Sequence, residues 1–366
     1  MNAKMLVKIA LSLVVGGVCV FFAVRGMDGH AVLAALRALS PGAIAIYAAT
    51  LAVTHLFRAW RWEFLLRPVG IRVPFKRILA ISSVGFMAIL AMPVRLGEFV
   101  RPYFVTRERG GSMTAALGTV AVERIVDGLL ISILFFGSYL VSAGDAFTRE
   151  LRVAAWASLV GFVGLTTFLA LARVWTEQTI AFALRVSLLQ YLAPARAAQL
   201  AHKLRALISG FNVLADHRNF GIFLGQSIVY WGVNGLGMWI LARQMNLPIS
   251  IGAAFTTMAV TGIVLTLPNS PGLVGQFEFA IKLGLGAYLP ATVVNANGIA
   301  YGIVLHGVQT IWYVGFGLLA LPMLSKRGHA SLGEAVRESN RAVEEVDAAE
   351  ESPADARPAR ESREGA

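Results

Sequence analysis

The stretch LAMPVRLGEFVR, residues 90–101, decides the kind of fold that this chain adopts. Fifteen apolar or small residues, 78–92, precede Pro93, whereas a helix needs about 20 residues to cross a bilayer. Pro93 and Gly97 interrupt a helix, and charged residues follow within the same stretch. Because a broken backbone is tolerated at membrane depth only where protein or water covers it, we expect a re-entrant helix here.

The composition agrees with a membrane protein. Of the 366 residues, 57% are hydrophobic and 14% are charged, whereas soluble domains carry about 25% charged residues. The single cysteine, Cys19, lies in an apolar stretch and is interpreted as a small packing residue. Six apolar segments are long enough, or nearly so, to cross the membrane: 5–24, 43–57, 113–141, 153–172, 220–242 and 296–321. We therefore predict an all-α, polytopic helical bundle with about six crossings.

A second broken helix follows the same plan as the first. Residues 251–267 are apolar and end at Pro268, Pro271 and Gly272, after which a short helical pattern resumes over 273–286. Gly275 and Glu278 then repeat the order of proline, glycine and glutamate seen around Pro93. Paired broken helices in two halves of a chain indicate an inverted repeat and a transporter site near the bilayer midplane.

The charges of the loops predict the topology, since positive loops favour the cytoplasmic side. Basic residues are concentrated in the segments 58–77, 95–109 and 173–219 and at Lys326-Arg327. The loops near 25–42, 142–152 and 243–250 hold few of them. Both flanks of the first broken helix therefore lie in the cytoplasm, so residues 78–106 dip in and return. The second hairpin, 251–286, enters from outside, and both termini are cytoplasmic.

These observations divide the chain into a membrane domain, 1–324, and an acidic tail, 325–366. The membrane domain comprises a first half (about 1–172), a cytoplasmic linker (173–219) and a second half (220–324). The linker mixes leucines at helical spacing with arginines, which fits either a helix lying on an anionic leaflet or a cytoplasmic helical hairpin. Residues 328–366 hold ten acidic residues and five arginines with few large apolar ones, so we expect the tail to be disordered.

Charged residues next to or within the apolar segments are the candidate site, because charges at membrane depth are costly and usually functional. Arg95, Glu98 and Arg101 are spaced three apart and would share one helical face. Two guanidiniums around one carboxylate suit the binding of a phosphate-bearing headgroup. The alternative is a charge cluster at the membrane edge that only sets the topology.

Two further groups complete this set. Glu123 and Asp127 share a face of a predicted crossing beside Arg124, which suits proton exchange if the carboxylates have no other partner. The alternative is a buried ion-pair network with Arg58 or Arg61. Glu278 precedes Lys282 by four residues, the favourable order for an ion pair, and follows a glycine-rich turn that could open onto a ligand.

Other residues and motifs favour plainer interpretations. His55 is interpreted as a hydrogen-bonded packing residue, and the aromatic residues as a belt at the membrane interface: Trp60, Trp62, Phe64, Trp231, Trp239, Trp312 and Tyr313. No Walker loop, metal-ligand spacing, nucleophile elbow or dinucleotide fingerprint is present. We therefore predict no catalytic residues, no metal and no cofactor. The short basic loops favour lipid over nucleic acid as a partner.

Four motifs in order resemble the lysylphosphatidylglycerol synthase transmembrane, or flippase-like, family: RAWRW (58–62), PVRLGEFVR (93–101), VERIVD (122–127) and PNSPG followed by GQFE (268–278). The resemblance covers roughly residues 5–324. One departure is Leu273, where a second glycine is often expected after Pro271-Gly272. The chain is thus similar to a stand-alone member without the soluble aminoacyltransferase domain that some members carry.

The resemblance implies a multi-pass protein of the bacterial cytoplasmic membrane that moves a polar or anionic lipid through a charged cavity. It implies that Arg58, Arg61, Arg95, Glu98, Arg101, Glu123, Arg124, Asp127 and Glu278 line the site. Phospholipid, polyprenyl-linked, glycolipid and hopanoid-type substrates all remain open, as do a homo-oligomer and a lipid-synthesis enzyme as partners. The alternative functions are an accessory subunit or enzyme of lipid or cell-envelope modification, and a small-solute transporter.

Overall fold

The computed structural model of the chain describes residues 3–91, 97–141, 147–186, 194–266 and 270–325. Every regular element in these residues is helical. The α-helices of more than three residues among the described residues are α1 (Ala3–Val24), α2 (Gly29–Arg37), α3 (Pro41–Leu66), α4 (Phe75–Ala91), α5 (Val100–Arg109), α6 (Met113–Val141), α7 (Arg149–Val174), α8 (Thr176–Val186), α10 (Pro194–Ser209), α11 (His217–Gln244), α12 (Ile251–Val264), α13 (Gln276–Leu285) and α15 (Ile299–Ser325). The predicted all-helical membrane bundle is confirmed.

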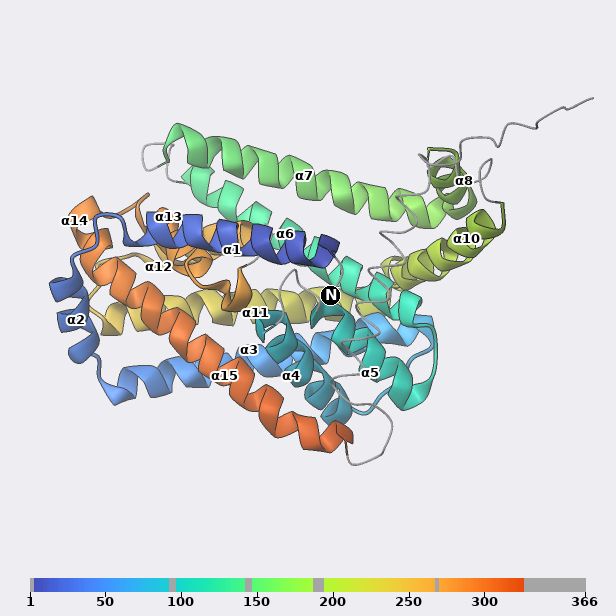
Figure 1. Cartoon of the computed structure of the whole chain (residues 1–366), viewed down its shortest axis with the longest axis horizontal. Helices are drawn as coiled ribbons and strands as arrows, with labels where there is room; N and C mark the ends of the chain where they lie inside the picture. The colour runs from blue at the N-terminus through green and yellow to red at the C-terminus, as the bar shows by residue number, and fades with distance from the viewer. Residues whose placement is uncertain (1–2, 92–96, 142–146, 187–193, 267–269, 326–366) are drawn as a thin grey trace, which may run out of the picture.

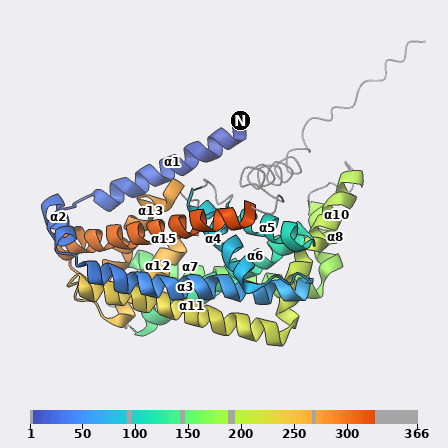
Figure 2. The same cartoon turned by 90° about the horizontal axis from the view of Figure 1, so that it is seen from below.

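The long helices run along the long axis of the molecule (Figure 1). Helices α3 and α11 lie side by side through the bundle, and α7 covers α6 on one flank (Figures 1 and 2). Short polar caps start the helices: Ser40, Thr148 and Ser250 each accept a hydrogen bond from the backbone amide three residues on. The chain reverses direction at the two opposite ends of the bundle, with α2 at one end and α8 and α10 at the other (Figure 1).

The first broken helix forms a hairpin whose two ends lie together. Arg77, at the start of α4, bonds to Glu108 at the end of α5, with 2.9 Å between Nε and Oε1. At its tip, the backbone of Gly97 lies against α4 so closely that a Cβ at this position would be 2.2 Å from the amide nitrogen of Ile89. Residues 78–106 therefore return to the end at which they started, as predicted, although Pro93 and Arg95 lie outside the described residues.

The second broken helix forms a matching hairpin from the opposite end of the bundle. Near its open end, Thr256 of α12 and Tyr288 share a hydrogen bond of 2.9 Å. Near its tip, Gln276 of α13 donates to the carbonyl of Val264 at 3.0 Å. The tip contains a one-turn helix, η4 (Pro271–Leu273), which contacts α4 of the first hairpin. The two hairpins thus meet inside the bundle; Pro268 lies outside the described residues.

The predicted number of crossings stays a prediction. Three spans are long and apolar enough to cross, Pro41–Val69, Arg149–Val174 and Ala291–Leu324, and a fourth results if the bent pair Leu13–Val24 and Gly29–Arg37 counts as one. That pair is bent by 87°. Helices α6 and α11 have 29 and 28 residues, which is also sufficient length. Polar residues of both helices contribute to the candidate functional site.

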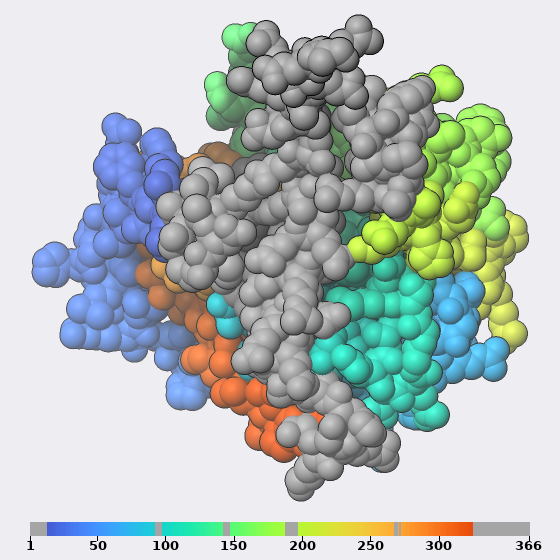
Figure 3. Space-filling view, turned by 45° about the vertical axis from the view of Figure 1, so that its right-hand side comes forward, coloured from blue at the N-terminus to red at the C-terminus, as the bar shows by residue number. Residues whose placement is uncertain are grey.

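The linker forms a helical hairpin in the described residues. Glu177 near the start of α8 accepts two hydrogen bonds from Arg205 late in α10, at 2.8 and 2.6 Å, so the helices run antiparallel. The hydrogen bonds from Arg205 lower the pKa of Glu177. Helix α10 packs against α6 at the end of the bundle where α5 also lies (Figure 3). Helices α8 and α10 therefore form an antiparallel pair in the described residues, while the cytoplasmic position of the linker stays a prediction.

The close backbone contact between α12 and α13 in the second hairpin can be tested by substituting a glycine. A Cβ on Gly284 of α13 would lie 2.7 Å from the Cα of Thr257 in α12, whereas nothing lies within 4 Å at Gly307 of α15. We expect Gly284→Val to lower the free energy of unfolding by about 1–3 kcal/mol, because the two helices must separate. Gly307→Val is the matched control. Thermal unfolding in detergent measures both, and equal stability of the two variants would contradict the described hairpin.

Candidate functional site

Arg61 is the centre of a charged cluster inside the bundle. Its side chain, from α3, is 0% exposed. It donates to both carboxylate oxygens of Asp127 on α6, at 2.5 and 2.7 Å, in a bidentate pair. It also donates to Glu123 at 3.2 Å and to the hydroxyl of Ser227 on α11 at 3.1 Å. One guanidinium thereby connects three helices.

Glu123 is fully buried and is the second residue of the cluster with several charged partners. Besides Arg61, it accepts hydrogen bonds from Arg101 of α5 at 2.9 Å and from Arg124 at 2.6 Å. Asp127 also accepts from the indole of Trp231 at 3.0 Å. Both carboxylates therefore have cationic partners, so the proton-exchange interpretation of Glu123 and Asp127 is wrong. Their four-residue spacing places them on one face of α6, where both meet Arg61.

Local sequence explains how Arg101 reaches this place. Gly85 of α4 leaves the room: a Cβ there would lie 2.3 Å from the Cγ of Arg101. The guanidinium of Arg101 lies over the ring of Trp62, 4.1 Å from its centre. The indole of Trp62 in turn donates to Thr119 of α6 at 3.1 Å. A small residue and an aromatic plane thus fix a buried cation, as expected for a cation–π contact without water.

The cluster holds more guanidinium donors than its carboxylates use. Arg101 is 1% exposed, yet its Nε and Nη2 have no hydrogen-bond partner among the described residues; the same holds for the Nε of Arg58 and of Arg124. Arg58 lies over the ring of Phe86 at 4.0 Å, and no ion pair joins it to a described carboxylate. Arg124 is the partly exposed member, with 29% of its side chain accessible. Unused donors of this kind suit an anionic acceptor.

Glu278 belongs to a second, separate constellation. Its carboxylate accepts the amide of Gly275 at 2.8 Å and lies 2.6 Å from Nδ1 of His306 on α15. The other ring nitrogen of His306 lies 2.8 Å from the carbonyl oxygen of Gly272. Among the described residues, no hydrogen bond or ion pair joins this group to the arginine cluster.

The expected pair between Glu278 and Lys282 is wrong. The ammonium of Lys282 instead donates to three backbone carbonyls at the end of α1, those of Phe22, Ala23 and Arg25, at 3.2, 3.2 and 2.6 Å. Free carbonyls at a helix C-terminus attract a cation, and they outcompete the carboxylate one turn away. Lys282 therefore attaches α1 to the second hairpin.

The predicted site residues lie in separate groups in the structure. It brings together Arg58, Arg61, Arg101, Glu123, Arg124 and Asp127, and the charge of Glu98 acts on Arg124 as well. Of the predicted breaks, Gly97, Pro271, Gly272 and Gly275 lie at the hairpin tips. Gly272 and Gly275 have positive φ angles of 66° and 78°, which only glycine adopts readily. Arg95 lies outside the described residues.

Several site residues were not found from the sequence. Ser227 and His306 carry no local motif. Their partners, Arg61 and Glu278, lie 166 and 28 residues away in the sequence, so local sequence patterns do not reveal these contacts.

The interpretation of the aromatic residues as an interfacial belt is wrong for Trp62, which is 0% exposed, and Trp231 donates a hydrogen bond to Asp127. It fits Trp60, which is 41% exposed. His55 is a hydrogen-bonded packing residue, as predicted, between Ser83 and Trp312.

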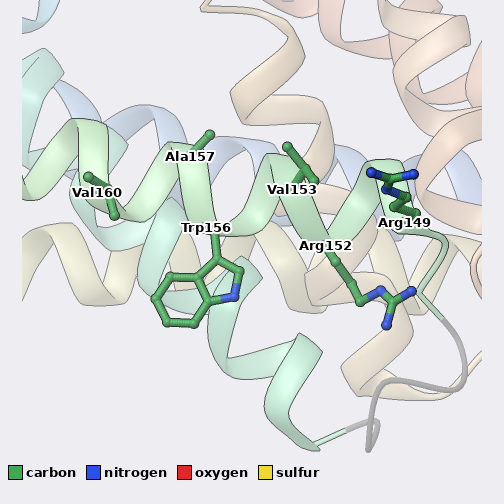
Figure 4. Close-up of a pocket in the computed structure, with 6 residues that line it drawn as sticks. All are labelled: Arg149, Arg152, Val153, Trp156, Ala157 and Val160. Atoms are coloured by element: carbon green, nitrogen blue, oxygen red, sulfur yellow. The ribbon is translucent and has the colours of Figure 1, made fainter.

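Two depressions lie on the surface away from this cluster. One, of about 660 Å³, opens at the end of the bundle where the first hairpin begins, and it is lined chiefly by Arg67, Arg72, Arg109, Arg218, Glu63 and Asp216. The other is shallow and lies along α7 beside Trp156, Val153 and Val160 (Figure 4). Its apolar side chains are more than half exposed, which suits contact with lipid chains. In the described residues, no group of three or more His, Cys, Asp or Glu side chains could hold a metal ion.

Comparisons with known proteins place these motifs in a family. A sequence model described as the lysylphosphatidylglycerol synthase TM region matches residues 9–317. The chain is 25% identical over 343 residues to the glycosyltransferase AglD of Haloferax volcanii, covering 86% of this chain and 53% of that protein. It is 22% identical over 195 residues to the UPF0104 membrane protein MJ1078 of Methanocaldococcus jannaschii, covering 52% and 75% of the two chains. No solved structure matches the chain.

The geometry of the cluster predicts different costs for two neighbouring arginines. Arg61→Leu leaves two buried carboxylates short of a partner, which costs about 3–5 kcal/mol of stability. Arg58→Leu removes a cation that pairs with no described carboxylate, so it should cost less than about 1.5 kcal/mol. Thermal unfolding of both variants in detergent measures the difference. Equal losses would contradict the central place of Arg61.

Proposed function

The chain belongs to the family of the lysylphosphatidylglycerol synthase TM region, and from this premise we propose that it moves an anionic lipid across the membrane. The headgroup would enter the bundle between the two hairpins while its hydrocarbon chains stay in the bilayer. The observation that carries the proposal is the set of buried guanidinium nitrogens, on Arg58, Arg101 and Arg124, that have no acceptor among the described residues.

A phosphate-bearing headgroup fits these donors best. Guanidinium groups bind phosphate oxygens through planar, bidentate hydrogen bonds, and each such bond is stronger away from water. Glu123 and Asp127 hold the arginines in position, so they would not repel an anion as free carboxylates would. Arg124, the partly exposed member, would meet the headgroup first. The exposed apolar side chains of α7 and α15 offer surfaces for the hydrocarbon chains.

We further propose that the protein has no catalytic, metal or cofactor site of its own and that membrane lipids, not nucleic acid, are its partners. The specific observation that favours a second function is the relative named as a glycosyltransferase. This chain spans about half the length of that protein, so an enzyme of lipid modification, or its accessory subunit, is the alternative. Product formation by the purified chain with a lipid and an activated sugar would favour that alternative.

The basic end of the bundle is proposed to face the cytoplasm, because positive residues are retained on that side. His217 and His30 are exposed residues near the two opposite ends. We expect His217→Cys, in a Cys19→Ser background, to be shielded in intact cells from a membrane-impermeant thiol reagent. His30→Cys, the matched control, should react. The reverse pattern would contradict the proposed orientation.

Transport is tested with purified protein in vesicles that contain a labelled anionic phospholipid. We expect Arg124→Gln and Arg58→Gln each to slow its translocation about tenfold or more, since a hydrogen bond to a charged group contributes about 1.5–3 kcal/mol. Arg205→Gln, which breaks the exposed ion pair with Glu177, is the control and should keep the rate of the unaltered protein.

Two results would contradict the proposal. One is translocation at the unaltered rate by both variants of the cluster. The other is equal translocation of an uncharged lipid by the unaltered protein, because guanidinium donors should select phosphate.

A further inference from the structure

Two buried histidines in this bundle have opposite hydrogen-bond environments. His55 of α3 accepts a hydrogen bond at Nδ1 from the indole of Trp312, 3.3 Å away. Its Nε2 lies 2.8 Å from the hydroxyl of Ser83, which itself donates to the carbonyl of Leu79. Nε2 of His55 is therefore the donor to Ser83. A neutral imidazole with one N–H satisfies all of these contacts.

His306 faces an acceptor at each ring nitrogen. Nδ1 lies 2.6 Å from the carboxylate of Glu278, and Nε2 lies 2.8 Å from the carbonyl oxygen of Gly272. A carbonyl oxygen cannot donate, so Nε2 must carry a proton. The Glu278 contact also needs a proton, which resides either on Nδ1 or on the carboxyl group. The pair therefore holds one proton more than a neutral histidine beside an ionised glutamate.

Few other ionisable groups approach this pair. Lys282, on the same helix as Glu278, is engaged by the carbonyls of α1, with Arg25 beside it. Helix α12 has no ionisable side chain. Other ionisable groups on helices that pack against α13 or α15 include Cys19 on α1, Lys76 and Arg77 at the far end of α4, His30 and Arg37 on α2, Tyr47, His55, Arg58, Arg61 and Glu63 on α3, Tyr301 and Tyr313 on α15 itself, and His217, Arg218, Tyr230 and Arg243 on α11, while α1 also carries Lys4 and Lys8 in its sequence. Among the described groups, the charge that acts on His306 is that of Glu278.

His306 is hydrogen-bonded to a turn with an unusual backbone conformation. Gly272, whose carbonyl accepts from His306, is followed by Leu273, and both have positive φ angles, of 66° and 61°. Such an angle is disfavoured for leucine and persists only where surrounding contacts maintain it. The turn contacts α4 of the first hairpin, and Gly275 lies directly against Val20 of α1. Loss of the proton would leave His306 with one N–H for two acceptors, so its ring lone pair would face either the Glu278 carboxylate or the Gly272 carbonyl at the point where the hairpins meet.

We propose that Glu278 and His306 form a proton-binding latch, which closes the tip of the second hairpin when the proton is bound and releases it when the proton leaves. The inference rests on the proposed lipid transport and names the proton as the coupling ion. The side chains of His306 and Glu278 are 11% and 16% exposed, so the proton can pass to and from water at this edge. The latch is complete at low pH and is lost as the pH rises.

Nuclear magnetic resonance of the folded protein tests the stored proton directly. With ¹⁵N-labelled histidine and ¹³C-labelled glutamate, the His306 signals are identified by their loss in His306→Gln. At about pH 6 we expect either two protonated ring nitrogens beside a carboxylate or one protonated nitrogen beside a carboxylic acid. One protonated ring nitrogen beside an ionised Glu278 would overturn the proposal.

Hydrogen exchange tests whether that proton holds the turn. From about pH 5 to about pH 9, the protection factor of the amides in residues 270–280, corrected for the intrinsic rate, should fall about tenfold or more in the unaltered protein. In His306→Gln it should not depend on pH. The control, His55→Gln, removes a buried histidine without a stored proton and should keep the pH response. A pH response that persists in His306→Gln, or is absent from the unaltered protein, would overturn the latch.

A third measurement separates the latch from the transport function. In vesicles, a pH difference across the membrane should change the rate of lipid translocation by the unaltered protein and by His55→Gln, but not by His306→Gln. Translocation that responds equally in all three would overturn proton coupling. If no variant moves lipid, the proposed function fails, and the coupling role fails with it, while the exchange result still decides whether the latch exists.

Discussion

The bidentate pair between Arg61 and Asp127 is the interaction on which the rest of the structure depends. It lies at full burial, and through Glu123, Ser227 and Arg101 it connects α3, α5, α6 and α11. Burial of charged groups costs several kcal/mol for each ion, so the cluster persists only because nearly every oxygen has a donor. In the part of the chain that the structure describes, the same arrangement leaves cationic nitrogens without acceptors. The stabilising network and the proposed headgroup site are therefore one feature.

The two hairpins have similar backbones and different chemistry. The first brings a guanidinium, that of Arg101, to the carboxylate of Glu123 and leaves two of its nitrogens without an acceptor among the described residues. The second brings a carboxylate, that of Glu278, to an imidazole and stores a proton. The tip of the second hairpin, η4, contacts α4 of the first. A bundle of this kind could bind an anion at one tip and respond to protons at the other.

Periodicity and breaks predicted the helices and hairpins because length, proline and loop charge act locally. Glu123 and Asp127 were recognised for the same reason, since their spacing places them on one helical face. Their partner Arg61 was only an alternative, because it lies 62 and 66 residues away. Lys282 was misassigned because helix-end carbonyls of α1 compete for it, and His306 was missed because one histidine in an apolar helix carries no motif. Tertiary contacts, not local pattern, decide these residues.

Native mass spectrometry of the protein purified from its membrane tests most directly whether the buried arginines hold an anionic headgroup. We expect an anionic, phosphorus-containing lipid to stay bound to the unaltered protein and to be lost from a variant in which Arg58 and Arg124 are both glutamine. Retention of only uncharged or zwitterionic lipids, or equal retention of the anionic lipid by that variant, would contradict it.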